Sequence, residues 1–293
     1  MNLTVTVLQV VAPVFILASI GFVWVKVGLE YRIEFVTQLA MTLSLPCLIF
    51  VSLMQTRIDP AALTALSLAA VVAYGIITLA FIILVRALRL ERRTYAAPLI
   101  FGNTGNLGLP LALFAFGDIG LSYAIIVFAV MALLAYTYGI WLVAGAGSLG
   151  KVLREPLAWG TVLGIIFLWQ GWETPEFLTN TLSLIGQIVI PVMLITLGVA
   201  IARLSAHGLM QATLLSLVKL ALCVGVAWGV GLFFELDPTA FGVLVLQVAT
   251  PVAVTSYLLA EKYGADAPPV AGLVVTSTVM SVVALPLVLA AVL

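Results

Sequence analysis

A succession of long apolar stretches, separated by short breaks that contain charged residues, proline or glycine, constrains this chain more than any other feature. A helix needs about 20 mostly apolar residues to cross the hydrocarbon core of a bilayer. Of the 293 residues, 64% are hydrophobic and 8% are charged, whereas about 25% are charged in an ordinary soluble domain. So few charges cannot cover so much apolar surface in water. We therefore predict an all-α integral membrane protein.

Ten stretches are long enough to be transmembrane helices, and the loops between them are too short for a separate domain. The predicted spans are residues 5–28, 33–54, 61–88, 95–117, 119–146, 156–172, 178–202, 208–234, 239–261 and 268–292. Loops after odd-numbered spans contain ten Lys or Arg residues, and loops after even-numbered spans contain only Arg57. The ten are Lys26, Arg32, Arg86, Arg89, Arg92, Arg93, Lys151, Arg154, Arg203 and Lys262. Positively charged loops stay in the cytoplasm, so we predict a multi-pass protein of the cell (inner) membrane with both termini outside the cytoplasm.

The two halves of the chain carry the same pattern of interruptions. Spans two and seven each contain a proline near their middle, Pro46 and Pro191, and spans four and nine each contain polar residues followed by Pro110 or Pro251. A lone proline is more often a tolerated kink, but here the prolines recur in matching order. Because five is odd, two five-helix halves would lie in the membrane with opposite orientations. The pattern predicts a 5+5 inverted repeat, residues 1–146 and 147–293, as in many secondary transporters.

Spans four and nine are predicted to be broken helices. Proline removes a backbone donor, and Gly105 and Gly108 weaken the helix before Pro110. Unpaired backbone groups persist at membrane depth only when they are buried in protein or line a wet cavity. The N-terminal end of a half-helix carries about half a positive charge. Two such ends from opposite repeats would therefore form an anion site without Lys or Arg.

Neutral polar residues accompany both predicted breaks. Asn103, Thr104 and Asn106 lie at the first, and Gln247 and Thr250 at the second. These side chains could merely satisfy the unwound backbone, or they could bind a ligand. We expect both roles, with Asn103 and Asn106 the main contacts to a substrate carboxylate. Pro46 and Pro191 are expected to bend the helices that flank the site.

Charges inside the spans are scarce. None of the spans contains a carboxylate well inside it, which argues against a proton antiporter that needs buried aspartates. Sodium coupling through carbonyl, Asn, Thr and Gln oxygens stays open, as does uniport driven by the membrane potential. Lys219 lies about ten residues into span eight. It could attract the substrate anion or bind a backbone carbonyl.

Other classes of protein fit poorly. The formal net charge is 0, which excludes a nucleic-acid partner that would need a basic patch. The lone His207 and the two cysteines, Cys47 and Cys223, provide no metal site or disulfide framework. An intramembrane enzyme would need a nucleophile with a base, paired aspartates or metal ligands, and no such set is present. We predict no enzymatic activity and no cofactor other than a possible Na⁺. A channel or a receptor is the remaining non-carrier alternative.

The stretch Asn103-Thr-Gly-Asn-Leu-Gly-Leu-Pro110 resembles the Asn-x-Gly-x-x-Gly-x-Pro signature of the auxin efflux carrier family, which includes bacterial organic-acid permeases and plant PIN exporters. Residues 251–264 and the Ser/Thr-rich last span resemble the same family. The resemblance implies the fold of bile-acid symporters, related to NhaA. It implies a scaffold domain (spans 1, 2, 6 and 7) and a transport domain (spans 3–5 and 8–10). Spans four and nine would cross at Pro110 and Pro251 beside the substrate, and the protein would form a homodimer.

This chain departs from the plant members of that family. It lacks a long loop between its halves, span three contains no acidic residue, and Ala249 and Thr250 precede Pro251 where an asparagine would be expected. The sequence therefore leaves a dicarboxylate and an auxin-like acid equally open as substrates. We predict a secondary transporter that moves a small organic anion by alternating access of the elevator type.

Overall fold

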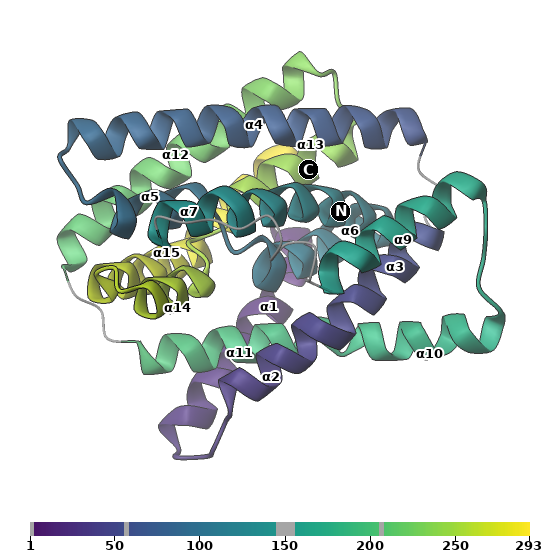
Figure 1. Cartoon of the computed structure of the whole chain (residues 1–293), viewed down its shortest axis with the longest axis horizontal. Helices are drawn as coiled ribbons and strands as arrows, with labels where there is room; N and C mark the ends of the chain where they lie inside the picture. Colours follow the sequence, from purple (N-terminus) through teal and green to yellow (C-terminus); the bar gives the residue numbers. More distant parts are fainter. Residues whose placement is uncertain (1–2, 56–58, 145–155, 205–207) are drawn as a thin grey trace.

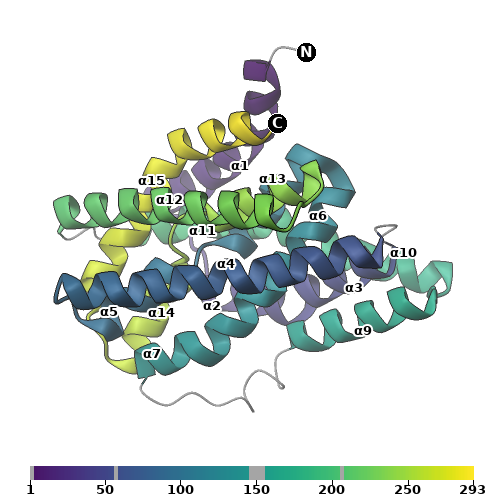
Figure 2. The ribbon, with the colours of Figure 1, turned by 90° about the horizontal axis from the view of Figure 1, so that it is seen from above.

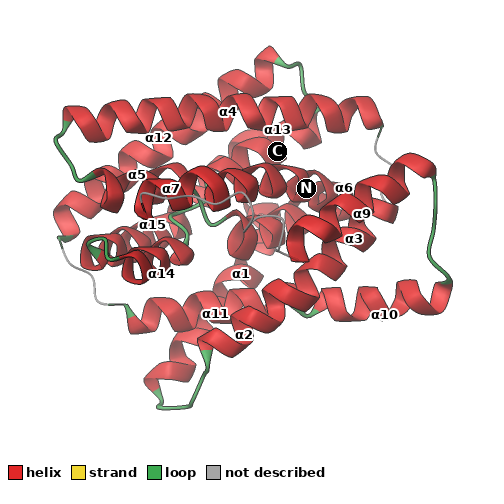
Figure 3. Ribbon diagram, viewed as in Figure 1, coloured by secondary structure: helices red, strands yellow, loops and turns green. Residues whose placement is uncertain are grey.

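The protein is built from helices. A computed structural model describes residues 3–55, 59–144, 156–204 and 208–293; Arg57, Lys151, Arg154 and His207 lie outside these ranges. The described residues contain no strand, only one isolated antiparallel bridge between Gly102 and Val252 (Figure 3). The α-helices are α1 (Leu3–Lys26), α2 (Ile33–Leu39), α3 (Leu45–Gln55), α4 (Pro60–Ala87), α5 (Arg92–Ile100), α6 (Leu109–Leu134), α7 (Ile140–Ala144), α9 (Pro156–Gln170), α10 (Glu176–Gln187), α11 (Val189–Arg203), α12 (Leu209–Phe233), α13 (Pro238–Val248), α14 (Val254–Tyr263) and α15 (Ala267–Val292). The π-helical segments are η1 (Ala40–Ser44), η2 (Thr104–Gly108) and η3 (Ala135–Gly139).

Seven of the described helical runs are long and apolar enough to cross a membrane. One of them, Thr104–Ala144, is 41 residues long, about twice what a bilayer requires. Inside it Gly117 adopts φ 66° and ψ −158°, a conformation open to glycine, and this residue divides α6 into two helical parts. The predicted boundary between spans four and five falls at this position. The described helices occupy all ten predicted ranges, and ten crossings stays a prediction.

Two of the predicted prolines follow a widened helical turn. The π-helical segments η1 and η2 each end two residues before a proline, Pro46 in α3 and Pro110 in α6. A proline ring clashes with the carbonyl four residues earlier, and a wider turn gives that carbonyl room. Pro191 lies in the first turn of α11, where the missing N–H has no helical partner to lose. The chain accommodates these prolines by local adjustment, without ending the helix.

The helices pack in two sets (Figures 1 and 2). In one set, α1 lies along α11, and α3 lies between α9 and α10; these are predicted spans 1, 2, 6 and 7. In the other, α12 packs on α15, α13 and α4, and α6 packs on α13 and α4. Helix α1 also contacts α6 and α15, so the two sets touch. The interrupted helices belong to the second set.

Close approach of α1 and α11 depends on glycine. A Cβ placed on Gly198 would overlap the carbonyl oxygen of Ala18, and one on Gly21 would overlap that of Ile195. Small residues at helix contacts compensate for the missing hydrophobic drive inside a bilayer. We expect Gly198→Val to lower the free energy of unfolding by about 1–3 kcal/mol, as overpacking does in other cores. The matched change Gly225→Val, at a position with no atom within 4 Å, should leave it unchanged. Thermal unfolding in detergent measures both, and equal effects would contradict this packing.

Candidate functional site

The two interrupted helices meet at their breaks. Helix α5 ends at Ile100 and η2 begins at Thr104, while α13 ends at Val248 and α14 begins at Val254. In the gaps between them the backbone N–H of Asn103 donates to the carbonyl of Pro251 at 2.7 Å. The neighbouring pair, Gly102 and Val252, forms the isolated antiparallel bridge. Two breaks about 150 residues apart in sequence therefore satisfy part of each other's backbone.

Glycines allow this close contact. A Cβ on Gly102 would overlap the hydroxyl oxygen of Thr250, and one on Gly108 would overlap the side-chain oxygen of Gln247. Gln247 is fully buried, so it has little room to move away. These glycines let the second break lie directly against the first.

The two prolines occupy different places at this crossing. Pro251 lies inside the second break, and its carbonyl accepts the hydrogen bond from Asn103. Pro110 is buried in the first turn of α6, several residues after the break at 101–103. The first break therefore ends at Asn103, the first residue of the cluster Asn103–Asn106, whereas the second break follows Gln247. The sequence analysis placed the polar residues at the breaks themselves, ahead of Pro110 and Pro251.

A cavity of about 320 Å³ lies against the crossing, between the two sets of helices. One part of its wall is polar and comes from η2, α14, α11 and α2. The polar lining residues are Asn103, Asn106, Thr255, Ser256, Thr196 and Thr37. The rest is apolar and includes Met41, Phe101, Phe128, Met131, Met193 and Leu258. Among the lining residues that the structure describes, Lys262 is the only charged one and none is a carboxylate. Thr255 is exposed, so the polar part of the wall is open to the surface of the protein.

Two helical segments begin beside this cavity. Segment η2 begins at Thr104 and α14 at Val254, and residues from the first turn of each line the cavity. The first N–H groups of a helix have no partner within it, and together they carry about half a positive charge. The side-chain Nδ2 of Asn103 is also buried without a hydrogen-bond partner. The site thus combines this unpaired amide with the positive ends of two helices, an arrangement suited to a carboxylate.

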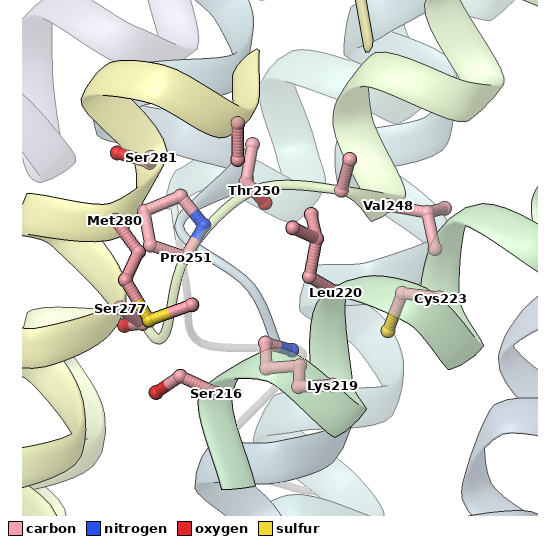
Figure 4. Close-up of a pocket in the computed structure, with 12 residues that line it drawn as sticks. Ser216, Lys219, Leu220, Cys223, Val248, Thr250, Pro251, Ser277, Met280 and Ser281 are labelled. Atoms are coloured by element: carbon pink, nitrogen blue, oxygen red, sulfur yellow. The ribbon is translucent and has the colours of Figure 1, made fainter. Parts of the chain in front are cut away.

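Other predicted site residues lie on the opposite side of the crossing. Thr250 and Lys219 line a second, smaller cavity of about 20 Å³ (Figure 4). The Thr250 hydroxyl donates to the carbonyl of Gln247 at 2.7 Å, and Gln247 Nε2 lies 3.5 Å from the carbonyl of Ala124. Lys219 was expected either to attract the substrate anion or to bind a backbone carbonyl. The structure shows the second contact, in which Nζ donates to the carbonyl oxygen of Leu99 at 2.8 Å.

The larger cavity thus gathers some of the predicted residues and adds others. Asn103, Gly105 and Asn106 line it, whereas Gln247, Thr250 and Lys219 do not. The Thr104 hydroxyl is fully buried without a partner and also lies outside the lining. Sequence reasoning missed Thr255 and Ser256. The sequence did contain a signal for these two residues, because they follow Pro251 and therefore lie in the first turn of the helix after the second break.

Among the residues that the structure describes, no group of three His, Cys, Asp or Glu side chains could hold a metal ion. Cys47 and Cys223 are both free. Pro191 lines a further cavity of about 420 Å³, together with Asp118 and Ser183. Pro46 lines none of these cavities; instead Gly160 of α9 packs on its backbone.

Several apolar helices, two of them interrupted and joined in the core, define a multi-pass membrane protein built like a transporter. Residues 6–152 and 145–289 match the family described as membrane transport protein. The chain therefore belongs to this family, the auxin efflux carrier family that residues 103–110 resemble. An uncharacterised transporter of Methanothermobacter thermautotrophicus is 28% identical over 95% of this chain and 96% of its own length. One of Methanocaldococcus jannaschii is 25% identical over 64% of each chain.

Proposed function

We propose that this protein is a secondary transporter for small organic monocarboxylates, which bind in the 320 Å³ cavity beside the crossing. The main observation behind this proposal is that two half-helix N-termini and the unpaired amide of Asn103 lie at a cavity whose described lining contains no carboxylate. In this proposal the chain is a carrier without enzymatic activity. It crosses the cell membrane ten times as a 5+5 inverted repeat, has both termini outside the cytoplasm and forms a homodimer.

The carboxylate would bind at the polar end of the cavity. Asn103 and Asn106 donate from the first break, and Thr255 and Ser256 donate from the first turn of α14. Hydrogen bonds to a charged group contribute about 1.5–3 kcal/mol each. The positive ends of two helices add to them. Gln247 and Thr250 have a different role in this proposal, which is to hold the two breaks together.

The apolar wall selects the rest of the substrate. A volume of about 320 Å³ is in the range of small-molecule pockets, whose walls are mainly apolar. A second carboxylate would lie against Met and Phe side chains, and burying an unpaired charge there is costly. The cavity therefore favours a monocarboxylate with an aromatic or branched apolar body, such as an auxin-like acid, over a dicarboxylate.

Alternating access would arise from movement between the two sets of helices. The 320 Å³ cavity borders α2 and α11 of one set and η2, α6 and α14 of the other. Its lining includes Ile33 and Lys262, which flank predicted cytoplasmic loops. The 420 Å³ cavity borders Asp118, which is predicted to lie outside. An elevator-type shift of the crossing would move the bound anion from one cavity toward the other. A membrane potential negative inside favours exit of a monovalent anion by about 2.3 kcal/mol per 100 mV.

The first test of this proposal is ligand-dependent thermal stability. We expect aromatic and branched monocarboxylates to raise the unfolding temperature of the purified protein, because a ligand at 100 times its dissociation constant adds about 2.7 kcal/mol. Dicarboxylates of similar size, and the matching uncharged amides, serve as controls and should have little effect. Stabilisation by the amides as strong as that by the acids would contradict an anion site.

A further inference from the structure

Lys219 is a buried lysine in the middle of α12. Its side chain is 3% exposed, and none of the described carboxylates forms an ion pair with it. A lysine inside a membrane-spanning segment is costly and marks a functional position by default. Its amine donates to the carbonyl of Leu99, the penultimate residue of α5 (Figure 4 shows the lysine beside the second break).

The Leu99 carbonyl is free for this bond because the first helix is interrupted. In a continuous helix it would accept from the N–H of Asn103, four residues later. That N–H instead donates to Pro251 across the crossing. The Lys219 amine therefore replaces a bond that the break removes, at the C-terminal and negative end of α5.

Helix α13, which precedes the second break, ends at the same place. The 20 Å³ cavity beside Lys219 is lined by Val248, Ala249, Thr250 and Pro251, which form the end of α13 and the break after it. The hydroxyl of Ser216 also lines it and is buried without a hydrogen-bond partner. Two helix C-termini together carry about one negative charge, and the ammonium supplies one positive charge. The cavity is large enough for about one water molecule.

We propose that the Lys219 ammonium occupies a monovalent-cation site at the crossing, so that the lysine serves as a tethered substitute for a coupling ion. Half-helix C-termini and unwound carbonyls are the groups that hold Na⁺ in transporters with broken helices. Here those groups face a cation that cannot leave, and the protein binds its substrate without Na⁺. This inference rests on the proposed transport function and removes its sodium-coupled alternative.

Removing the amine should expose the site to free ions. The experiment compares the unfolding temperature of the full-length protein in detergent, in LiCl, NaCl, KCl and choline chloride at equal ionic strength. We expect wild type to unfold at the same temperature in all four salts. Lys219→Ala should unfold at a lower temperature in choline, and one small alkali cation should raise it by about 5 °C or more at 100 times its dissociation constant. Lys219→Met, which fills the space with an apolar chain, should be destabilised without recovering in any salt.

Three results would overturn the inference. One is stabilisation of wild type by sodium over choline. Another is a folded Lys219→Ala variant that responds to none of the cations. The last is a Lys219→Ala variant that cannot be purified in folded form in any of the four salts, because a free ion would then be unable to replace the ammonium. Recovery of the folded variant in an alkali salt but not in choline would support the inference. No organic anion is present, so these results are independent of the carboxylate measurements that test the proposed function.

Discussion

Replacing Asn106 with alanine is expected to lower the apparent affinity for the transported carboxylate by about 10- to 100-fold. Asn106 lines the 320 Å³ cavity in the first turn after the first break. A hydrogen bond to a charged group contributes about 1.5–3 kcal/mol, and each 1.4 kcal/mol is a tenfold change in affinity. Uptake of labelled substrate into proteoliposomes, measured over a range of concentrations, gives the effect.

The matched control is Asn180→Ala, the same change at an exposed position of α10. It should leave transport unchanged. Without ligand, both variants should unfold at the same temperature as wild type. Among the described residues, no side chain or backbone group forms a hydrogen bond with the Asn106 side chain, so removing it takes no such bond from the fold. Wild-type affinity in Asn106→Ala would show that the carboxylate binds elsewhere, and in that case Thr255 and Ser256 would have to be tested alone.

Periodicity and composition made the helical fold predictable. Long apolar runs can satisfy their backbone only as helices at membrane depth, so the all-α prediction is confirmed by the described residues. The paired prolines also marked the two interrupted helices. The backbone contact itself, Asn103 N–H to Pro251 O, could not be read from the sequence, because it depends on how closely Gly102 and Gly108 let the second break approach.

The direction of each half-helix explains why the candidate site could be assigned only in part. Asn103 and Asn106 follow the first break or lie at its end, so they belong to a positive N-terminal end. Gln247 and Thr250 precede Pro251 and belong to a negative C-terminal end. In our proposal the donors for the anion therefore come from the first cluster, and a substrate contact by Gln247 or Thr250 stays a prediction. The corresponding positions after the second break are Thr255 and Ser256, at the start of α14.

The sequence gives no sign of this difference between the two breaks, because the prolines are similarly spaced in both halves: Pro46 and Pro110 are 64 residues apart, and Pro191 and Pro251 are 60 residues apart. The two intervals align Pro110 with Pro251, but Pro110 lies within the first turn of α6 whereas Pro251 lies inside the break itself. Proline is compatible with the start of a helix and with an unwound segment, so its position alone does not locate a break. The widened turn η2 is what lets the first helix resume before Pro110.

The second large effect is expected at the contact between the two interrupted helices. Gly108→Ala should lower the free energy of unfolding by about 1–3 kcal/mol, as overpacking a close-packed site does, and should abolish most transport. The added methyl would overlap Oε1 of Gln247, which is fully buried and packed near the Ala124 carbonyl. Thermal unfolding and proteoliposome uptake measure the two consequences. Gly75→Ala in α4, where no atom lies within 4 Å, is the matched control and should not lower stability or transport.

A double-mutant cycle with Gln247→Ala distinguishes this contact from a general sensitivity of η2 to substitution. Gln247→Ala alone should destabilise the protein, because it leaves a cavity. Combined with Gly108→Ala it should cost less than the sum, because the methyl then enters the vacated space, and residues in contact couple by about 0.5–3 kcal/mol. Additive effects would mean that Gly108 is required for another reason, such as the widened turn before Pro110. Because the same contact holds the donors of η2 beside those of α14, the combined variant should also recover part of the lost transport.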